Sequence, residues 1–359
     1  MMYRNSEQFS HHQSDKIGVL ITNLGTPESP TKPALRRYLK EFLSDPRVVE
    51  VPRFIWWFIL NLVILNIRPK RSARAYSTVW TEQGSPLMTI TRQQRDALQQ
   101  RLTKLYGENV LVEFAMRYGQ PAIKDVVHSM LGKGVRKLLV LPLYPQYCAS
   151  TTASTFDALA QDFTQRRWLP ELRFVTQYHD NPDYISALAN KISAHWQSHG
   201  KAQKLIFSYH GIPKRYLTNG DPYHCQCLKT TRLVAERLGL TQDEYLTTFQ
   251  SRFGREEWLQ PYTDETLKGL PAKGAKSVQV ICPGFSADCL ETIEEIGEEN
   301  REVFLAAGGE SYQYIAALNS DDDHMAALTR IIETNLYGWT IGGDNEARSK
   351  LALAAGAEK

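Results

Sequence analysis

The chain has 359 residues, of which 42% are hydrophobic and 23% are charged, a composition typical of a globular protein with room for two domains. Its net charge of +3 and its lack of a long basic run argue against nucleic-acid binding. Five cysteines, an odd number in a chain this long, argue against a disulfide scaffold and fit a reducing compartment.

The two ends of the chain differ in composition from the middle. Residues 1–15 are polar and contain no apolar segment followed by a small-residue cleavage site, so we expect a flexible extension rather than a secretory signal. Residues 341–359 are expected to be a disordered tail. Together with the cysteine content, these features predict a cytoplasmic protein.

One apolar segment stands out, "RFIWWFILNLVILNIRPKR" at residues 53–71. It is shorter than the roughly 20 residues that cross a bilayer, and basic residues flank it. It carries three adjacent aromatic residues, Trp56, Trp57 and Phe58. The segment could be a core helix, or a partly exposed lip over residues 53–67 that touches a membrane or a flat apolar ligand. Asn61 and Asn66 interrupt the apolar face and favour the lip.

The rest of the chain alternates short apolar runs with helix-like segments, which predicts an α/β fold with parallel sheets. Seven strands are expected in two groups, so we predict two doubly wound, Rossmann-like domains. The expected strands lie within residues 16–27, 109–119, 135–146, 172–179, 203–213, 245–254 and 277–285. The expected divisions are residues 16–165, residues 166–312, and a helical segment at 313–340 that packs back on the first domain.

Ligands of doubly wound sheets bind beyond the carboxyl ends of the strands, so the residues at these ends are candidates for a site between the domains. They include Asn23, Gly25, Arg117, Tyr118, residues 144–147, residues 208–210, residues 250–252, Phe285 and Ser286. None of the glycine-containing turns forms a G-x-G-x-x-G fingerprint or a P-loop, so the sequence gives no support for nucleotide binding.

His210 follows the apolar run "KLIFSY" and precedes Gly211. A lone histidine is more often a surface or core residue than a functional one. Its position at a strand end favours a functional role. Imidazole titrates near neutral pH, so it can accept a proton or bind a transition metal.

The stretch "GFSADCLETIEEIGEEN" at residues 284–300 brings many carboxylates to the end of another strand. If it forms an α-helix, its acids at i, i+3, i+7 and i+10 share one face, and these are Asp288, Glu291, Glu295 and Glu298. Glu294 and Glu299 would then point elsewhere. The row is either a solvated face or a path for metal ions or protons that leads to His210, where carboxylate and imidazole would suit Fe²⁺, Mn²⁺, Co²⁺ or Zn²⁺.

The strand-end motifs together resemble the ferrochelatase family. The matching stretches are "GVLITNLGTPE", "GSPLMTITRQQ", "MRYGQPAI", "LYPQYCASTTAS", "SYHGIPKRYLTNGDPY", "WLQPYTDETLKGL" and "GFSADCLETIEEI", which span roughly residues 17–320. The resemblance implies two doubly wound domains around a porphyrin and an enzyme that inserts Fe²⁺ into protoporphyrin IX, the last step of haem synthesis, with release of two protons.

The resemblance also implies roles for particular residues. It assigns catalysis and metal contact to His210 and Glu291, and a proton or metal path to Asp288 and Glu295. The implied porphyrin-binding residues are Arg117, Tyr118, Tyr147, Trp258 and Phe285. It places Trp56, Trp57 and Phe58 in a lip that contacts a membrane. The resemblance therefore implies that the protein binds peripherally to the inner face of a membrane.

Some members of the family carry a [2Fe-2S] cluster, but this chain has no cysteine after Cys289, and Cys225 and Cys227 form only half of an internal set. We therefore expect no cluster and no required cofactor, with Fe²⁺ as a substrate. Two alternatives remain open: a chelatase for coproporphyrin or for cobalt, and a non-catalytic haem- or porphyrin-binding paralogue.

Overall fold

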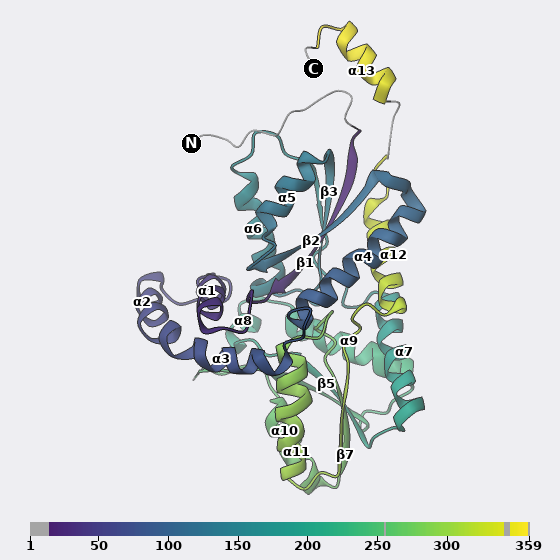
Figure 1. The fold of residues 1–359 in the computed structure, drawn as a ribbon. Helices are drawn as coiled ribbons and strands as arrows, with labels where there is room; N and C mark the ends of the chain where they lie inside the picture. The colour runs from purple at the N-terminus through teal and green to yellow at the C-terminus, as the bar shows by residue number, and fades with distance from the viewer. Residues whose placement is uncertain (1–13, 255, 341–344, 358–359) are drawn as a thin grey trace.

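The computed structural model describes residues 14–254, 256–340 and 345–357. It is an α/β protein with two four-stranded parallel sheets, one in each domain, as the sequence predicts (Figure 1). The expected flexible extension at residues 1–15 lies almost wholly outside the described residues.

The first sheet has the order β2-β1-β3-β4 and is parallel throughout. Its strands are β1 (Lys16–Gly25), β2 (Val110–Tyr118), β3 (Val135–Pro142) and β4 (Glu171–Phe174). β1 and β3 are continuous apolar runs, because a central parallel strand is covered by helices on both faces.

The second sheet repeats this arrangement with the order β6-β5-β7-β8. Its strands are β5 (Lys204–His210), β6 (Tyr245–Gln250), β7 (Ser277–Ile281) and β8 (Ser311–Ile315). In each sheet the second strand pairs with one edge of the first strand, and the third strand pairs with the opposite edge. The strand order therefore reverses beside β1 in the first sheet and beside β5 in the second.

Helices cover both faces of each sheet (Figure 1). The first sheet packs against α4 (Pro86–Tyr106), α5 (Ile123–Gly132) and α6 (Ser154–Phe163), and the second against α7 (Pro182–His199), α9 (Tyr223–Leu238), α10 (Thr263–Gly269) and α11 (Asn300–Ala306). Helix starts follow local chemistry: the Ser85 hydroxyl accepts a hydrogen bond from the Met88 amide, and Pro86 occupies the first turn of α4. The short elements are α8 (Lys214–Thr218), η2 (Gly107–Asn109), η3 (Ala149–Ala153) and η4 (Pro271–Lys273).

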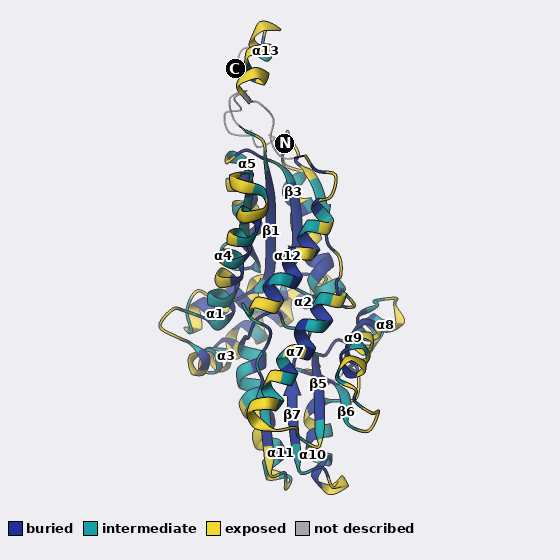
Figure 2. Cartoon of the chain, turned by 90° about the vertical axis from the view of Figure 1, so that its right-hand side faces the viewer, coloured by how far each residue is buried: buried dark blue, intermediate teal, exposed yellow. Residues whose placement is uncertain are grey.

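The two domains share one apolar core. A single cluster of buried side chains includes Val19 and Leu139 of the first sheet together with Phe207 and Tyr209 of the second. Helix α12 (Asp322–Leu336) packs against α7 of the second domain and against α4 and β3 of the first, so it joins the two. Figure 2 shows the strands as a buried axis running through both domains.

A helical arm leaves the first domain at the level where the two domains meet (Figure 1). It comprises α1 (Lys32–Leu43), α2 (Arg53–Phe58), the π-helix η1 (Ile59–Ile64) and α3 (Leu65–Val79). Pro69 lies inside α3 and cannot donate to the Leu65 carbonyl one turn earlier. The Arg36 guanidinium of α1 donates to that carbonyl instead, which ties α3 to α1.

Three sequence predictions about boundaries are wrong. The segment at 172–179 was expected to open the second domain, but β4 pairs with β3, so the first sheet extends past residue 165. β8 was not predicted, and it extends the second sheet to Ile315. Part of the expected disordered tail forms the helix α13 (Asn345–Ala354), whose alanine and leucine residues have high helix propensity.

None of the helices in the described ranges is long and apolar enough to cross a membrane.

Candidate active site

The reversal of strand order in the second sheet brings two loops together. β5 lies between β6 and β7, so the loops that follow β5 and β7 leave the sheet on opposite sides of the same point. Ligands of doubly wound folds bind at such a point. The first of these loops begins at His210, and the second leads through Asp288 to Glu291, so the topology alone brings the two predicted groups to one edge.

His210 is the last residue of β5 and is partly buried. Its Nδ1 lies 2.6 Å from the Gly211 carbonyl oxygen. A carbonyl only accepts hydrogen bonds, so Nδ1 carries the proton and Nε2 keeps its lone pair. The imidazole is therefore held in the tautomer that can accept a proton or bind a metal through Nε2.

An indole is packed against the chain beside this histidine. A Cβ on Gly211 would lie 2.8 Å from the Gln250 carbonyl oxygen and 3.2 Å from Trp258, so only glycine allows this approach. Trp258 is 5% exposed, and the ring of Phe253 lies 4.7 Å from it between centroids. Its Nε1–H has no hydrogen-bond acceptor within the described residues.

Gln250 connects His210 to the acidic segment. It is opposite His210 in the β5–β6 ladder, and its Nε2 donates to the Glu291 carbonyl oxygen at 3.3 Å. Within the part of the chain that the structure describes, the His210 and Glu291 side chains form no hydrogen bond or ion pair with each other. The ladder and the amide therefore link the end of β5 to the backbone at the start of η5.

The acidic segment is a π-helix, η5 (Glu291–Glu299), rather than an α-helix. Residues four apart lie on one side of a helix, so Glu291, Glu295 and Glu299 follow one another along the segment. The negative charges of Glu291 and Glu299 both raise the pKa of Glu295. The predicted row ended at Glu298 and left out Glu299, and which of these two exposed residues continues the row stays a prediction.

Glu295 lies in the middle of the row, where burial, as the largest cause, and its two neighbours raise its pKa to about 7. The Ser251 amide donates to Glu295 Oε1 at 2.7 Å and the Ser251 hydroxyl donates to Oε2, and these bonds lower the pKa in part. Ser251 adopts a φ of +64°, uncommon for a residue other than glycine. A carboxyl group with this pKa both takes up and releases protons near neutral pH.

Asp288 is placed differently from the row. It is 8% exposed, and its carboxylate accepts hydrogen bonds from the Tyr314 hydroxyl at 2.6 Å, Asn319 Nδ2 at 2.7 Å, the Thr292 hydroxyl at 3.0 Å and the Ala317 amide at 3.3 Å. A carboxylate with four donors is a structural anchor. The structure thus gives Asp288 a role in holding the start of η5, and its predicted place on a proton or metal path stays a prediction.

Comparison with known proteins agrees with this geometry. The family model for ferrochelatase matches residues 16–336. The ferrochelatase of Idiomarina loihiensis is 68% identical over 98% of this chain and 97% of its own length, and that of Pseudoalteromonas atlantica is 66% identical over the full length of both. This chain belongs to the ferrochelatase family.

The fold is also found in a more distant protein. A solved structure of SirB from Bacillus subtilis with Fe³⁺ has a TM-score of 0.53 and covers 89% of this chain and 96% of that one. The two are 10% identical, so the likeness shows a shared fold alone.

The residues that the ferrochelatase resemblance assigned to porphyrin binding are not equally available. The Arg117 guanidinium donates to Asp45 at 2.5 Å and to the Ser154 hydroxyl at 2.7 Å. Tyr118 is 0% exposed and its hydroxyl donates to Asp45 at 2.8 Å. The Tyr118 ring lies in the apolar core of the helical arm, and its predicted contact with the ligand stays a prediction.

Tyr147 and Phe285 remain accessible. Tyr147 is partly exposed, and its amide donates to the Gln226 side chain at 2.7 Å. Phe285 is partly buried and packs against the buried cluster of Leu87, Ala287 and Cys289. Because Leu87 belongs to α4, Phe285 lies where the second domain meets the first.

The lip of this ferrochelatase is an exposed apolar surface. Trp57 is 57% exposed and Phe58 is 43% exposed. We use "the apolar lip" for these two residues together with the other exposed apolar side chains of the arm, Phe54, Ile55, Ile59, Leu62, Val63 and Ile67. Trp56 does not belong to it, since it is 8% exposed and its Nε1–H donates to the Leu43 carbonyl at 2.6 Å.

The cysteines do not gather into a metal site. Cys225 is exposed, whereas Cys148 and Cys227 are buried. Burial, with a smaller effect of Asp221, raises the pKa of the Cys148 thiol to about 12, so it stays protonated. No group of three or more metal-binding side chains occurs in the described ranges. The expected absence of a [2Fe-2S] cluster stays a prediction.

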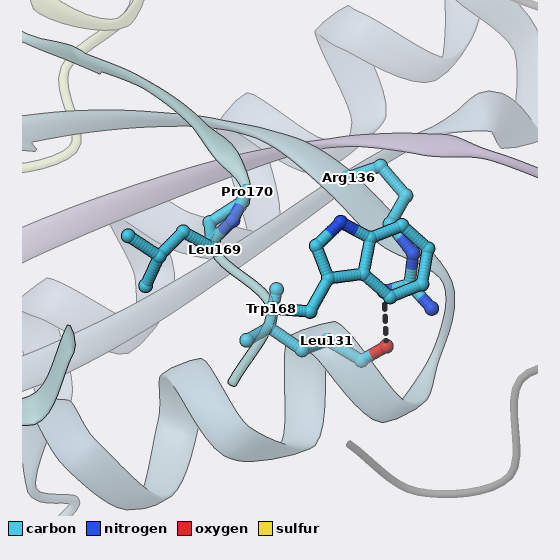
Figure 3. Close-up of a pocket in the computed structure, with 5 residues that line it drawn as sticks. All are labelled: Leu131, Arg136, Trp168, Leu169 and Pro170. Carbon is cyan, nitrogen blue, oxygen red and sulfur yellow. Dashed lines mark hydrogen bonds between the residues drawn. The ribbon is translucent and has the colours of Figure 1, made fainter. Parts of the chain in front are cut away.

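A small pocket lies away from these residues, at the amino-terminal end of β3 and before β4 (Figure 3). Leu131, Arg136, Trp168, Leu169 and Pro170 line it, and the Arg136 guanidinium lies 4.2 Å from the Trp168 ring centroid. Because ligands of this fold bind at the opposite ends of the strands, this pocket is separate from the site around His210.

The environment of Glu295 predicts a pH-dependent stability difference. Its pKa is raised from 4.5 to about 7, so the unfolded chain ionises this group at lower pH than the folded protein does. The contribution of Glu295 to the stability of the folded protein is therefore fully present below pH 4.5, and it is lost as the pH rises toward 7. Glu295→Gln lacks the ionisable group and so does not lose this stability. We expect its free energy of unfolding to exceed that of the wild type by an amount that increases from pH 4.5 to pH 7 and reaches at most about 3 kcal/mol.

Urea denaturation of both proteins at pH 5, 6, 7 and 8 measures this margin. Glu298→Gln, at an exposed position outside the row, is the control and should differ from the wild type by a constant amount. A margin for Glu295→Gln that stays flat over the window, or that narrows, would contradict burial of this carboxyl group.

Proposed function

We propose that this chain inserts Fe²⁺ into protoporphyrin IX to give protohaem, with release of two protons. The observation that supports it best is the placement of His210 and Glu291 in the two segments that follow β5 and β7, at the reversal of strand order in the second sheet, with Gln250 paired to His210 in the ladder and bonded to the Glu291 backbone. The relatives that cover the whole chain carry the name ferrochelatase.

The chemistry requires a base close to the ring nitrogens. A free porphyrin holds two pyrrole protons, and metal enters only after the macrocycle bends and both protons leave. Binding of the apolar ring supplies free energy for bending. His210 accepts the first proton, because its Nδ1–H is directed to the Gly211 carbonyl and Nε2 is left as the base.

The second proton leaves through the carboxylate row. Glu291 accepts it and passes it to Glu295, whose pKa of about 7 suits both uptake and release. Glu299 is exposed and delivers the proton to solvent. His210 releases the first proton to water and Glu291 passes the second along the row. Both residues then contact the entering Fe²⁺ in turn, since imidazole and carboxylate both suit this ion.

The protein side of the porphyrin site comes from both domains. Phe285 offers an aromatic face and Tyr147 offers a hydroxyl, while the buried Trp258 supports the chain beside His210. Arg117 would bind a propionate in exchange for its ion pair with Asp45.

The apolar lip favours protoporphyrin over more polar porphyrins. We propose that the protein is cytoplasmic and binds the inner face of a membrane through this surface, where an apolar product can leave. Five free cysteines agree with a reducing compartment. Coproporphyrin, with four carboxylates, has no need of an apolar exit, so the relative insertion rates for the two porphyrins distinguish these substrates.

The first test is anaerobic insertion of Fe²⁺ into protoporphyrin IX, followed by the change in the Soret band. We expect turnover by the wild type and a loss of about 100-fold or more in His210→Ala, because general-base catalysis contributes 10²–10⁴-fold. Porphyrin binding, measured by fluorescence quenching, should stay within about threefold, since the apolar ring supplies most of the affinity.

His199→Ala, an exposed histidine on α7, is the matched control and should retain full turnover. Unimpaired turnover in His210→Ala would remove His210 from catalysis. Porphyrin binding without any turnover by the wild type would favour the non-catalytic binding protein.

The π-helical row makes a second prediction. Glu299→Gln should lower kcat about 5- to 50-fold, because it removes the last proton acceptor before solvent. Glu298→Gln, the next residue back and equally exposed, should change kcat by less than about twofold, a size typical of surface substitutions. The reverse order of effects would restore the α-helical row and refute the row through Glu299.

The apolar lip makes the third prediction. The double variant Trp57→Ser/Phe58→Ser should bind anionic phospholipid vesicles at least about tenfold more weakly in a sedimentation assay, because it removes two large apolar side chains from the surface. Trp168→Ser, which alters a 43% exposed tryptophan remote from the lip, should bind as the wild type does. Equal vesicle binding by all three proteins would show that the lip does not contact lipid.

A further inference from the structure

Asn319 lies in the loop between β8 and α12 and has an unusual backbone. Its φ is +47°, in the left-handed region that asparagine tolerates better than most residues other than glycine. Such a conformation persists where surrounding contacts hold it, and it points to a role for the residue. Nothing in the sequence pattern singles it out, because β8 before it was not predicted.

The side chain of Asn319 is paired with Asp288 in both directions. Its Oδ1 accepts a hydrogen bond from the Asp288 amide at 2.8 Å, and its Nδ2 donates to Asp288 Oδ2 at 2.7 Å. Asp288 precedes η5 by three residues, and its other carboxylate oxygen accepts from the Thr292 hydroxyl inside η5. The amide of Asn319 therefore fixes the chain on one side of Glu291 while Asp288 fixes it on the other.

The backbone carbonyl of Asn319 extends this contact to the first domain. It accepts hydrogen bonds from Gln94 Nε2 at 3.0 Å and from His324 Nδ1 at 2.7 Å. Gln94 belongs to α4, is 0% exposed, and its Nε2 also lies 3.0 Å from the Ser286 carbonyl oxygen. The Asn319 and Ser286 carbonyl oxygens can only accept hydrogen bonds, so the Gln94 side-chain atom between them must be the NH₂ group. This determines the orientation of the Gln94 amide.

From these contacts we propose that Asn319 is a positioning residue for metal insertion: it sets the direction of the Glu291 carboxylate and ties it to the first domain through Gln94. The inference rests on the proposed function, and specifically on contact between Glu291 and iron. Asn319 touches neither substrate, so it acts through Asp288 and the start of η5.

This role differs from general support of the fold in what it does to the kinetics. Loss of folded protein lowers the apparent kcat and leaves both Michaelis constants unchanged. A displaced Glu291 raises the KM for Fe²⁺ and lowers kcat in the protein that is folded, while the KM for porphyrin, which depends on other residues, stays the same.

The decisive variant is Asn319→Asp. It keeps a side chain that tolerates positive φ but places a carboxylate oxygen where Nδ2 donates to Asp288, so two negative charges face each other across a 2.7 Å contact. We expect the KM for Fe²⁺ to rise about 5- to 20-fold and kcat per folded protein to fall about 10- to 100-fold, since small misplacement of a reacting group costs this much. The KM for protoporphyrin IX should stay within about twofold of the wild-type value.

The exchanged pair Asp288→Asn/Asn319→Asp supplies the rescue. An amide at position 288 can donate to a carboxylate at 319, while its own oxygen still accepts from Tyr314, Thr292 and Ala317. We expect the double variant to recover the KM for Fe²⁺ to within about threefold of the wild type, because the hydrogen bonds are restored with one charge in place of two. Asn335→Asp on α12, where the amide makes one bond to the Ile331 carbonyl, is the control and should behave as wild type.

Asn319→Gly keeps the backbone conformation and removes the side chain, so it serves if Asn319→Asp does not fold, and it should show the same selective rise in the KM for Fe²⁺. The inference is overturned if the folded variants keep the wild-type KM for Fe²⁺, or if the exchanged pair is no better than Asn319→Asp. A wild type that binds protoporphyrin but inserts no iron overturns the proposed function instead, and this inference with it.

Discussion

The burial of one carboxylate, that of Asp288, sets the geometry on which the rest of the site depends. An ionised carboxylate that is out of contact with water is costly unless donors surround it, and Asp288 has four. These donors come from η5, from β8 and from the loop after β8. Satisfying one buried charge therefore fixes three segments relative to each other, and the residue three positions later, Glu291, is held as a consequence.

The same logic explains why the site does not depend on loop flexibility. The two sheets share a continuous apolar core, and α12 packs on elements of both domains. Gln94 adds hydrogen bonds from α4 to Ser286 and Asn319 of the second domain. A pair of domains joined in this way holds the segments that carry His210 and Glu291 in fixed positions relative to each other.

The sequence predicted the parts of this structure that follow from hydrophobic pattern and strand topology. Apolar runs located seven of the eight strands, and the rule that ligands bind beyond carboxyl ends brought His210 and the acidic segment to one edge. β8, "SYQYI", was missed because it is short and alternates polar with aromatic residues. β4 was placed in the wrong group because the chain alone does not reveal which sheet a strand joins.

Side-chain environments were harder to predict than positions. Tyr118 lies at a strand end, as a ligand-binding residue would, yet Asp45, distant in sequence, draws its hydroxyl into the core. Trp56 and Trp57 are adjacent, but one is anchored to the Leu43 carbonyl and the other is exposed. Long-range partners of this kind decide burial, and one sequence contains no local signal for them.

The acidic row of η5 was only partly predicted. Glu291, Glu295 and Glu299 are spaced four residues apart, and the charges of Glu291 and Glu299 both act on Glu295. Three neighbouring carboxylates, the middle one largely buried, do not all ionise at once, because each charge opposes the next. The row therefore retains a proton near neutral pH, as the raised pKa of Glu295 indicates. A carboxyl group that keeps a proton near neutral pH next to Glu291 agrees with the proposed route, in which Glu291 passes a proton toward solvent.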